Sequence, residues 1–287
     1  MKETSRRLVR ALLGKKGYEY LQFYRHVGYW PHLRHPRSFN EKICNFKLYG
    51  RGEFATRLQD KWLAREHVAE KVGKEVLTRV FWYGEFLRDL PLKDLPGSFV
   101  VKTTDGAGGT GVVLVEDKEE MPTGKLKEKI EGLGTTTDRY GKAFHYYTNE
   151  WWYAKIPRRL LVEEFVRGRD GGVPIDYKCF VFHGKVVFIQ ADLGRFVQHR
   201  RSLYTPEWDR LDIEYNYPSG EDVDTPPDLE RMIGVAEALG AGVPFLRVDL
   251  FNPRPGRIIF CEFTIAPSLG HGPFRPQSFD FELGRRW

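Results

Sequence analysis

The sequence is poor in cysteine and lacks any long apolar run. Its 287 residues include three cysteines, Cys44, Cys179 and Cys261, which have no paired spacing and so offer neither a disulfide framework nor a metal site. No apolar stretch approaches the roughly 20 residues needed to span a bilayer. Arg10 interrupts the only apolar patch of the N-terminus, so no secretory signal is evident. We therefore expect a cytoplasmic protein.

Several motifs of catalysis and recognition are also missing. The chain has no P-loop and no dinucleotide-binding fingerprint, because no helix is expected after the glycines of residues 106–111. It has no recognisable Ser/His/Asp or Cys/His motif, no Asp-x-Asp motif of a sugar-nucleotide site and no internal repeat. The net charge of +6 suits a protein that handles anions. No RNP-type, zinc-finger or helix-turn-helix signature accompanies this charge, so nucleic acid is not the expected partner.

The N-terminus is strongly basic. The first sixteen residues hold six lysines and arginines and one acid, with Leu8, Ala11 and Leu12 at helical spacing. This pattern is compatible with a helix that lies on an anionic membrane surface at the inner face of the membrane. A solvated basic helix is the alternative.

The order of expected elements indicates an α+β fold with largely antiparallel sheets around a cleft. Residues 1–75 are mainly helical, with a capping-box spacing at Ser38 and Glu41 and a helix over 57–72 that ends at Gly73. Strands then alternate with loops, and residues 179–189 form a hairpin. A further helix runs from Pro226 to Gly240.

Residues 245–266 predict two strands around a Pro/Gly turn. Because strand side chains alternate between faces, Asp249 lies opposite Glu262, and Arg247 opposite Thr264. Two carboxylates directly across a sheet repel each other, and a cation such as Mg²⁺ between them removes the repulsion. We therefore expect that neutralising either carboxylate leaves the metal-free protein at least as stable. A sheet with one solvated face is the alternative interpretation.

A glycine-rich loop follows a strand that ends in Lys102. Gly106, Gly108 and Gly109 would let backbone N–H groups approach phosphate oxygens, and Lys102 adds a positive charge. The pattern fits a hairpin lid over a polyphosphate, and an ordinary mobile turn is the alternative.

Three further groups are weak signals in isolation. They are a strand with paired acids at residues 160–168, Asp176 two residues before Lys178, and Asp60 beside Lys61 on a helix. Each is equally well read as a surface charge cluster.

The order of these parts resembles that of the ATP-grasp superfamily. More narrowly, the chain is similar to the branch named for the teichuronopeptide biosynthesis protein, which is associated with bacterial surface polysaccharides. This closer similarity spans roughly residues 36–284. It rests on Phe39-Asn40-Glu41-Lys42, Asp60-Lys61, Leu95-Pro96 with Phe99-Val100-Val101-Lys102, Asp176-Tyr177-Lys178, Arg247-Val248-Asp249-Leu250 and Glu262-Phe263-Thr264.

The resemblance implies that ATP lies between two α+β subdomains, at residues 76–168 and 169–287, after the helical region 1–75. Lys102, with Lys61 and the glycine loop, would bind the phosphates. The adenine would lie against Glu163, Glu164, Phe165 and Val166, and the ribose against Asp176. Mg²⁺ would be held by Asp249, Glu262 and, less securely, Thr264, because many ATP-grasp enzymes have Asn there. Arg247 and Lys178 would act as catalytic residues that face the γ-phosphate.

The large N-terminal substrate domain usual in that superfamily is missing, so other parts must recognise the acceptor. Aromatic faces suit sugar rings and arginines suit a carboxylate. We name Trp151, Trp152, Arg195 and Arg200 as candidates, and His199 and Arg201 in the same loop also suit a carboxylate. Loop packing is the alternative.

The resemblance implies an ATP- and Mg²⁺-dependent carboxylate–amine ligase that forms an amide through an acylphosphate. Its substrates would be a uronic acid of a surface glycan or its precursor, and an amino acid or other amine. A kinase of the same fold is one alternative. A polysaccharide-biosynthesis protein labelled as a glycosyltransferase is another.

Overall fold

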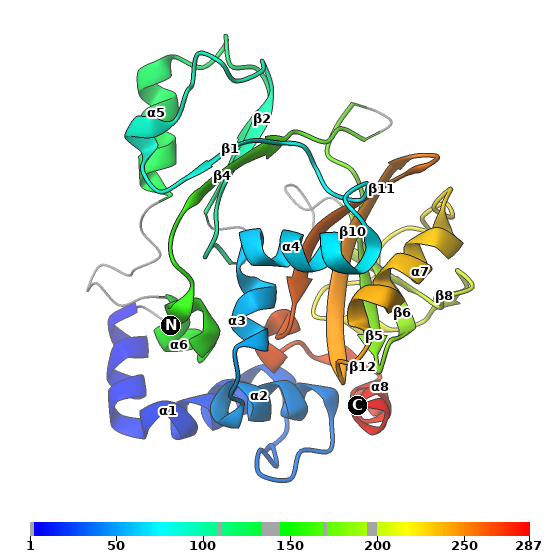
Figure 1. Ribbon diagram of the computed structural model, residues 1–287. Helices are drawn as coiled ribbons and strands as arrows, with labels where there is room; N and C mark the ends of the chain where they lie inside the picture. Colours follow the sequence, from blue (N-terminus) through cyan, green and yellow to red (C-terminus); the bar gives the residue numbers. More distant parts are fainter. Residues whose placement is uncertain (1–2, 108–110, 134–143, 169–170, 194–199) are drawn as a thin grey trace.

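Two antiparallel sheets of unequal size frame the protein (Figure 1). The computed structural model describes the chain except for residues 1–2, 108–110, 134–143, 169–170 and 194–199. The small sheet has the order β1-β4-β2-β3, with strands β1 (Val80–Gly84), β2 (Phe99–Thr103), β3 (Val112–Val115) and β4 (Leu160–Glu164). The large sheet has the order β11-β10-β5-β6-β7-β8, with strands β5 (Asp176–Phe182), β6 (Lys185–Leu193), β7 (Arg200–Tyr204), β8 (Arg210–Leu211), β10 (Phe245–Arg254) and β11 (Arg257–Thr264). Two short strands, β9 (Glu214–Tyr215) and β12 (Phe274–Arg275), pair separately.

Helices surround these sheets (Figure 1). The α-helices are α1 (Glu3–Val27), α2 (Phe39–Tyr49), α3 (Phe54–Gln59), α4 (Lys61–Val72), α5 (Thr123–Gly132), α6 (Phe144–Thr148), α7 (Leu229–Gly240) and α8 (Ser278–Arg286). The 3-10 helices are η1 (Leu87–Asp89), η2 (Trp151–Lys155) and η3 (Pro267–Gly270). The predicted capping box at Ser38 and Glu41 is confirmed.

The single helix predicted over 57–72 is wrong, because the chain forms α3 and α4 there. The Asp60 side chain accepts hydrogen bonds from the backbone N–H groups of Trp62 and Leu63 and so caps the start of α4. An N-cap residue has extended backbone, here φ −73° and ψ 116°, which ends α3 at the preceding residue. The predicted end of α4 at Gly73 is confirmed.

The two sheets have separate cores. The small sheet packs against α5 through residues such as Val101, Leu126 and Ile130. The large sheet shares one core with α2, α3, α4 and α7, whose buried members include Phe39 and Val68. Much of the predicted region 1–75 is therefore joined to the C-terminal sheet by apolar packing. The smaller cluster between α1 and α2 consists of Phe23, Leu33, Cys44 and Leu48.

Candidate active site

Two cavities lie side by side between the sheets. The first, of about 560 Å³, has a largely apolar wall that includes Val100, Leu114 and Ile259, and we call it the apolar cavity. The second, of about 520 Å³, is lined by ionisable groups that include Glu150 and Arg201, and we call it the polar cavity. Both cavities are lined by Lys61, Lys102, Gly106, Glu163, Phe260, Cys261 and Glu262, which define their junction.

Lys102 is one of the two lysines at the junction of the cavities. It lies at the end of β2 and forms an ion pair with Glu163 of β4. Arg65 Nη1 of α4 also bonds Glu163 Oε2, at 3.1 Å, and the Thr78 hydroxyl donates to the same oxygen at 2.8 Å. Burial disfavours the charge of Lys102, but the interaction with Glu163 outweighs it and raises the pKa of Lys102. Lys102 therefore stays cationic at neutral pH.

The residues expected around an adenine line the apolar cavity. Glu164, Phe165 and Val166 follow one another along its wall. Glu164 also forms an ion pair with Arg257 of β11, which connects the two sheets at this end of the cavity. The carboxylate of Glu163 is held by Lys102, Arg65 and the Thr78 hydroxyl, so two cations and one hydroxyl engage its oxygens. The adenine-binding role of these four residues stays a prediction.

Lys61 is the second cation at the junction. Its Nζ donates to the carbonyl oxygen of Gly106, and its backbone N–H donates to the Thr104 carbonyl oxygen at 3.1 Å. Burial lowers the pKa of Lys61. Helix α4 therefore begins against the first part of the glycine loop. Gly108 and Gly109 lie outside the described residues.

The β10–β11 hairpin has the predicted register, with Asp249 opposite Glu262 and Arg247 opposite Thr264. The expected repulsion between the carboxylates is nevertheless absent, because Arg247 lies between them. Its Nε and Nη2 donate to the two oxygens of Asp249 at 2.7 and 2.6 Å, and Nη2 is 3.7 Å from Glu262 Oε1. Asp249 is buried, and Arg247 and Lys178 outweigh burial and lower its pKa. The premise that an unrelieved repulsion destabilises this pair is therefore wrong, and we now expect that neutralising Asp249 lowers stability.

Lys178 is enclosed by carboxylates. It pairs with Asp249 across β5 and β10, and its Nζ donates to Asp249 Oδ2 at 2.7 Å and to Asp176. Asp192 Oδ2 lies 3.9 Å away. Burial alone would lower the pKa of Lys178, but Asp176 and Asp249 raise it. Lys178 lines the polar cavity, and the surrounding carboxylates neutralise its charge. Its catalytic role stays a prediction.

Asp176 lies where the two cavities approach each other. It lines the apolar cavity and bonds Lys178, whose partner Asp249 lies nearby. Burial raises the pKa of Asp176, and the nearby Asp249 carboxylate acts in the same direction. Its expected contact with a ribose stays a prediction.

A second arginine–carboxylate pair extends this charge network, and it lies in the loop from Asp192 to Trp208 that the sequence marks for acceptor recognition. Arg201 Nε donates to Asp192 Oδ1 at 2.9 Å, and its guanidinium lies 4.5 Å from the centre of the Tyr217 ring. Of the two neighbouring arginines named from the sequence, Arg201 lines the polar cavity, whereas Arg200 bonds the Ser219 carbonyl oxygen and does not line it. Neighbouring residues of a strand point to opposite faces, so choosing between them required the pairing of β6 with β7. The predicted Arg195 and His199 lie outside the described residues.

Neither of the predicted tryptophans lines the apolar or the polar cavity. Trp152 is fully buried in the core and Trp151 packs edge-on against it, so packing explains this pair. Their chain neighbours Glu150 and Tyr153 line the polar cavity instead. The Tyr153 hydroxyl donates to Gln59 Oε1 at 2.7 Å, which fixes η2 against α3.

The carboxylates of the junction suit Mg²⁺ in their chemistry, but they differ in availability. Both oxygens of Asp249 are engaged by Arg247 and Lys178. The Glu262 side chain is 44% exposed, its ion-pair contact with Arg247 is 3.7 Å long, and its charge also acts on the nearby Lys61 and Lys102, so its oxygens are open to the cavity. Thr264 lines the polar cavity beside it. Glu262 is therefore the carboxylate that fits a metal as it stands.

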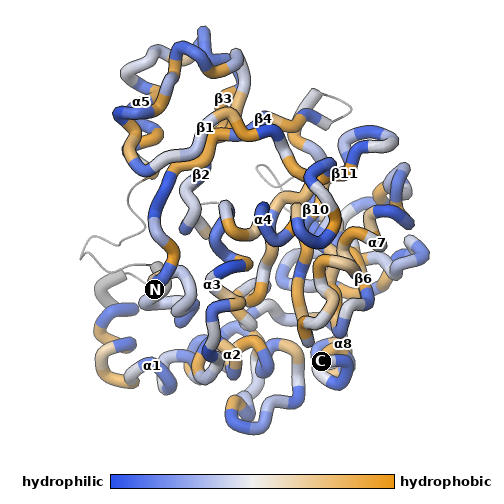
Figure 2. Tube along the Cα trace, in the orientation of Figure 1, coloured by the Kyte–Doolittle hydropathy of each residue, from blue (hydrophilic) through white to orange (hydrophobic). Residues whose placement is uncertain are grey.

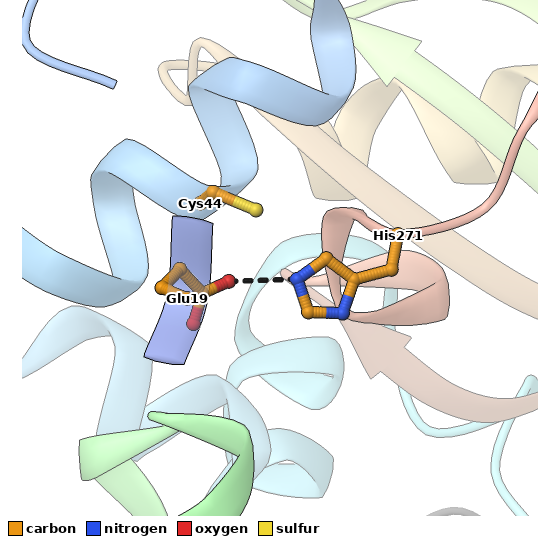
Figure 3. A group of neighbouring side chains, drawn as sticks. All are labelled: Glu19, Cys44 and His271. Carbon is orange, nitrogen blue, oxygen red and sulfur yellow. Dashed lines mark hydrogen bonds and ion pairs between the residues drawn. The ribbon is translucent and has the colours of Figure 1, made fainter. Parts of the chain in front are cut away.

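Another group of possible metal ligands is formed by residues that line neither cavity. Glu19, Cys44 and His271 offer ligand atoms within 4.8 Å of one another (Figure 3). Lys47 Nζ lies 2.7 Å from Glu19 Oε1, and Asn149 donates to the other oxygen. Burial and the Lys47 charge lower the pKa of His271 to about 4, so this ring is neutral at neutral pH. Lys47 already neutralises Glu19, and the cluster is explained as a buried ion pair between α1, α2 and the segment after η3.

Two antiparallel sheets enclose the cavities, with Lys102 on the small sheet and Asp249 and Glu262 on the large sheet, and the protein is of the ATP-grasp class. A sequence model of the TupA-like ATPgrasp family matches residues 41–287. The chain belongs to this family, and the predicted family and the ATP-grasp fold class are confirmed. Among curated proteins none matches the chain.

Solved structures of ligases are similar in fold. One is D-alanine–D-alanine ligase from Bacillus anthracis complexed with ATP, at 17% identity and a TM-score of 0.42, with 73% of this chain and 54% of that chain covered. Another is L-amino acid ligase from Bacillus licheniformis, at 18% identity and a TM-score of 0.47, with 80% and 49% covered. The chain thus spans about half the length of these structures. Within the described residues, no helix is long and apolar enough to cross a membrane.

Proposed function

We propose that the protein is an ATP- and Mg²⁺-dependent carboxylate–amine ligase that forms an amide through an acylphosphate. The observation that carries this proposal is the junction between the two cavities. There Lys61 and Lys102 lie where a polyphosphate from the apolar cavity would end, and Glu262 faces the polar cavity, where an acceptor would enter. Transfer of a phosphoryl group from ATP to an acceptor requires one site for the flat adenine ring and one for the charged acceptor. The two cavities provide these two sites.

In this proposal the adenine occupies the apolar cavity, and Lys102 and Lys61 bind the phosphates. Lys102 is fixed in direction by Glu163, so the enzyme does not have to organise this charge when ATP arrives. Mg²⁺ would be held by Glu262, with Asp249 as a second carboxylate, and it would neutralise charge on the phosphate oxygens.

The chemical step joins the two cavities. A carboxylate oxygen of the acceptor attacks the γ-phosphorus, the bond to the β-phosphate oxygen breaks, and ADP leaves. Arg247 is held by Asp249 through two hydrogen bonds, so its guanidinium is preorganised beside the transferred phosphoryl group. The amine then attacks the acyl carbon, and phosphate leaves.

We assign the carboxylate to a uronic acid of a bacterial surface polysaccharide or its precursor, and the amine to an amino acid or similar compound. The support is the resemblance to the teichuronopeptide branch, together with Arg201 and Arg247 on the wall of the polar cavity. Dependence on ATP favours action in the cytoplasm.

The test is ADP and phosphate release with a panel of uronic acids and amino acids, followed by product masses. The ligase should release ADP and phosphate in equal amounts only with both substrates, and hydroxylamine should trap the acylphosphate as a hydroxamate when the amine is omitted. Arg247→Ala should depress turnover far more than ATP affinity. A stable phosphorylated product without free phosphate would identify a kinase instead.

A further inference from the structure

Glu150 is a carboxylate of the polar cavity to which neither the family resemblance nor the phosphate chemistry gives a role. It lies between α6 and η2, on the wall that Tyr153 and Leu269 also form. Only 6% of the residue is exposed, and this residue faces the cavity. A buried carboxylate is stable as an anion only if a cation or several hydrogen-bond donors satisfy it.

The protein supplies Glu150 with little compensation. Lys47 is the charged group that most favours its ionised form, but Lys47 Nζ bonds Glu19 Oε1 and the Leu269 carbonyl oxygen, both at 2.7 Å. The Thr148 hydroxyl hydrogen-bonds Glu150, and the nearby negative charge of Glu19 disfavours its ionisation. Burial dominates and raises the pKa of Glu150 to about 7. A cation from outside the protein would complete this environment.

We propose that Glu150 binds the ammonium group of the amine substrate and accepts one of its protons. This inference rests on the proposed ligase function and adds the position of the amine. The arginines that suit a carboxylate, Arg201 and Arg247, line the same cavity, so it offers a cationic and an anionic partner for two different substrates. The amine class is a primary amine that is cationic at neutral pH, such as an α-amino acid.

The proposed reaction accounts for every proton that the ammonium group loses. The ammonium gives one proton to the ionised Glu150, and the resulting amine nitrogen forms a bond to the acyl carbon while the bond to the phosphate oxygen breaks. The second proton of the nitrogen leaves with the phosphate. A carboxylate whose pKa lies near the working pH is well matched to this role, because both of its protonation states are populated.

The backbone around the cavity supports a functional role for this wall. Asn216, Ser268 and Leu269 have φ values of 60°, 48° and 60° and all line the polar cavity. Non-glycine residues with positive φ persist only where the surroundings hold them in place, and they cluster at binding sites. Leu269 also receives the Lys47 ammonium on its carbonyl oxygen, so the strained segment and the Glu150 wall are joined.

The test is thermal unfolding with ethanolamine, L-alanine and L-lysine as probe amines in the presence of Mg-ADP. At least one amine should raise the Tm of the wild type, and this rise should grow as pH increases through about 7, where Glu150 ionises. Glu150→Gln should weaken the apparent amine affinity at least about tenfold and remove the pH dependence. The control is Glu128→Gln on the exposed face of α5, which should behave as the wild type.

The outcomes separate this inference from the ligase proposal. If Mg-ATP stabilises the wild type but no probe amine does, the amine site alone is overturned. An unchanged amine response of Glu150→Gln would overturn it as well. A wild type that does not respond to Mg-ATP would overturn the ligase proposal itself. Glutamine has the shape of the protonated carboxyl group, so the variant should fold, and its retained response to Mg-ATP verifies this.

A separate observation concerns the first half of α1. Leu8, Leu12 and Leu13 are 61%, 75% and 46% exposed, and Gly14, with φ 65°, bends the helix directly after them. Figure 2 shows α1 at the edge of the molecule. Basic residues that are also exposed flank these leucines, namely Arg6, Arg7, Lys15 and Lys16. The sequence between residues 4 and 18 contains no acid.

We infer that this segment binds the surface of an anionic lipid bilayer. Apolar side chains flanked by lysine and arginine match the boundary between acyl chains and anionic headgroups. A second copy of the chain fits less well, because it would bring two clusters of positive charge together. On the inner side of the helix, Arg10 bonds Asn149 Oδ1 at 2.8 Å, which holds the segment against the body of the protein.

The test is flotation with vesicles of phosphatidylglycerol and phosphatidylcholine, compared with phosphatidylcholine alone. The wild type should float only with the anionic vesicles, and high salt should weaken the binding. Leu8→Ser with Leu12→Ser should lose it, while Phe86→Ser, which changes an exposed apolar residue elsewhere, should not. Equal binding to both vesicles, or none to the anionic ones, would overturn the inference, as would a concentration-dependent dimer that the leucine changes abolish.

Discussion

Asp249→Asn should strongly destabilise the metal-free protein. Asp249 is buried and accepts hydrogen bonds from Arg247 at 2.7 and 2.6 Å and from Lys178 at 2.7 Å. Removing its charge leaves two buried cations without their shared partner. Breaking a buried ion pair by removal of one partner costs about 3–5 kcal/mol. Asparagine keeps one acceptor oxygen and Asp176 still bonds Lys178, so we expect a loss near the lower limit, about 3 kcal/mol.

Glu262→Gln is the matched control on the facing strand. The Glu262 side chain is 44% exposed and its cation contact is 3.7 Å long, so its neutralisation should change the free energy of unfolding by less than about 0.5 kcal/mol. Urea unfolding of both variants, followed by tryptophan fluorescence without metal, measures the difference. Equal stability of Asp249→Asn and the wild type would refute the view that Asp249 anchors Arg247 and Lys178.

Three further predictions concern nucleotide binding and ionisation. Mg-ATP should raise the Tm of the wild type in proportion to the logarithm of the Mg-ATP concentration. Lys102→Ala should lose this response while staying folded, because Arg65 still pairs with Glu163. An unchanged Tm response of Lys102→Ala would contradict the role of Lys102. The native state holds the Glu150 proton up to pH about 7, whereas the unfolded chain releases it near 4.5. As the pH rises between these values, the wild type should therefore lose about 3 kcal/mol of stability relative to Glu150→Gln, which urea unfolding measures. If the two proteins had parallel pH profiles of stability, Glu150 would not be buried in this way. Burial raises the pKa of Cys261, so iodoacetamide should label this thiol slowly at neutral pH. Because Cys261 lines both cavities, bound Mg-ATP should slow the labelling further. An equal labelling rate with and without the nucleotide would place ATP elsewhere.

The structural features that the sequence predicted correctly depend on residues close together in the chain. The hairpin register followed from the period of two and the turn at Pro255 and Gly256, and the capping box followed from the spacing of Ser38 and Glu41. The electrostatics of the hairpin were misjudged although the residues were known. Arg247 lies two residues from Asp249 on the same strand face, where its long side chain neutralises the carboxylate directly.

The contacts that could not be predicted join distant segments. Glu163 meets Arg65 across 98 positions of sequence, and Arg201 reaches the polar cavity only because β7 pairs with β6 in one register. Trp152 and Glu150 belong to one aromatic run, yet one is core and the other faces the cavity. No periodicity separates them, because the chain there forms a short 3-10 helix after an irregular turn.

The central claim is that an acceptor carboxylate is activated by phosphoryl transfer at the junction of the two cavities. The most direct measurement follows a heavy-oxygen label from the carboxylate of a uronic acid, with ATP and an amino acid, into the products. An acylphosphate route requires that one labelled oxygen appears in the released phosphate and that the other stays in the amide. Phosphate without label, or labelled oxygen that stays entirely in a phosphorylated product, would contradict the account.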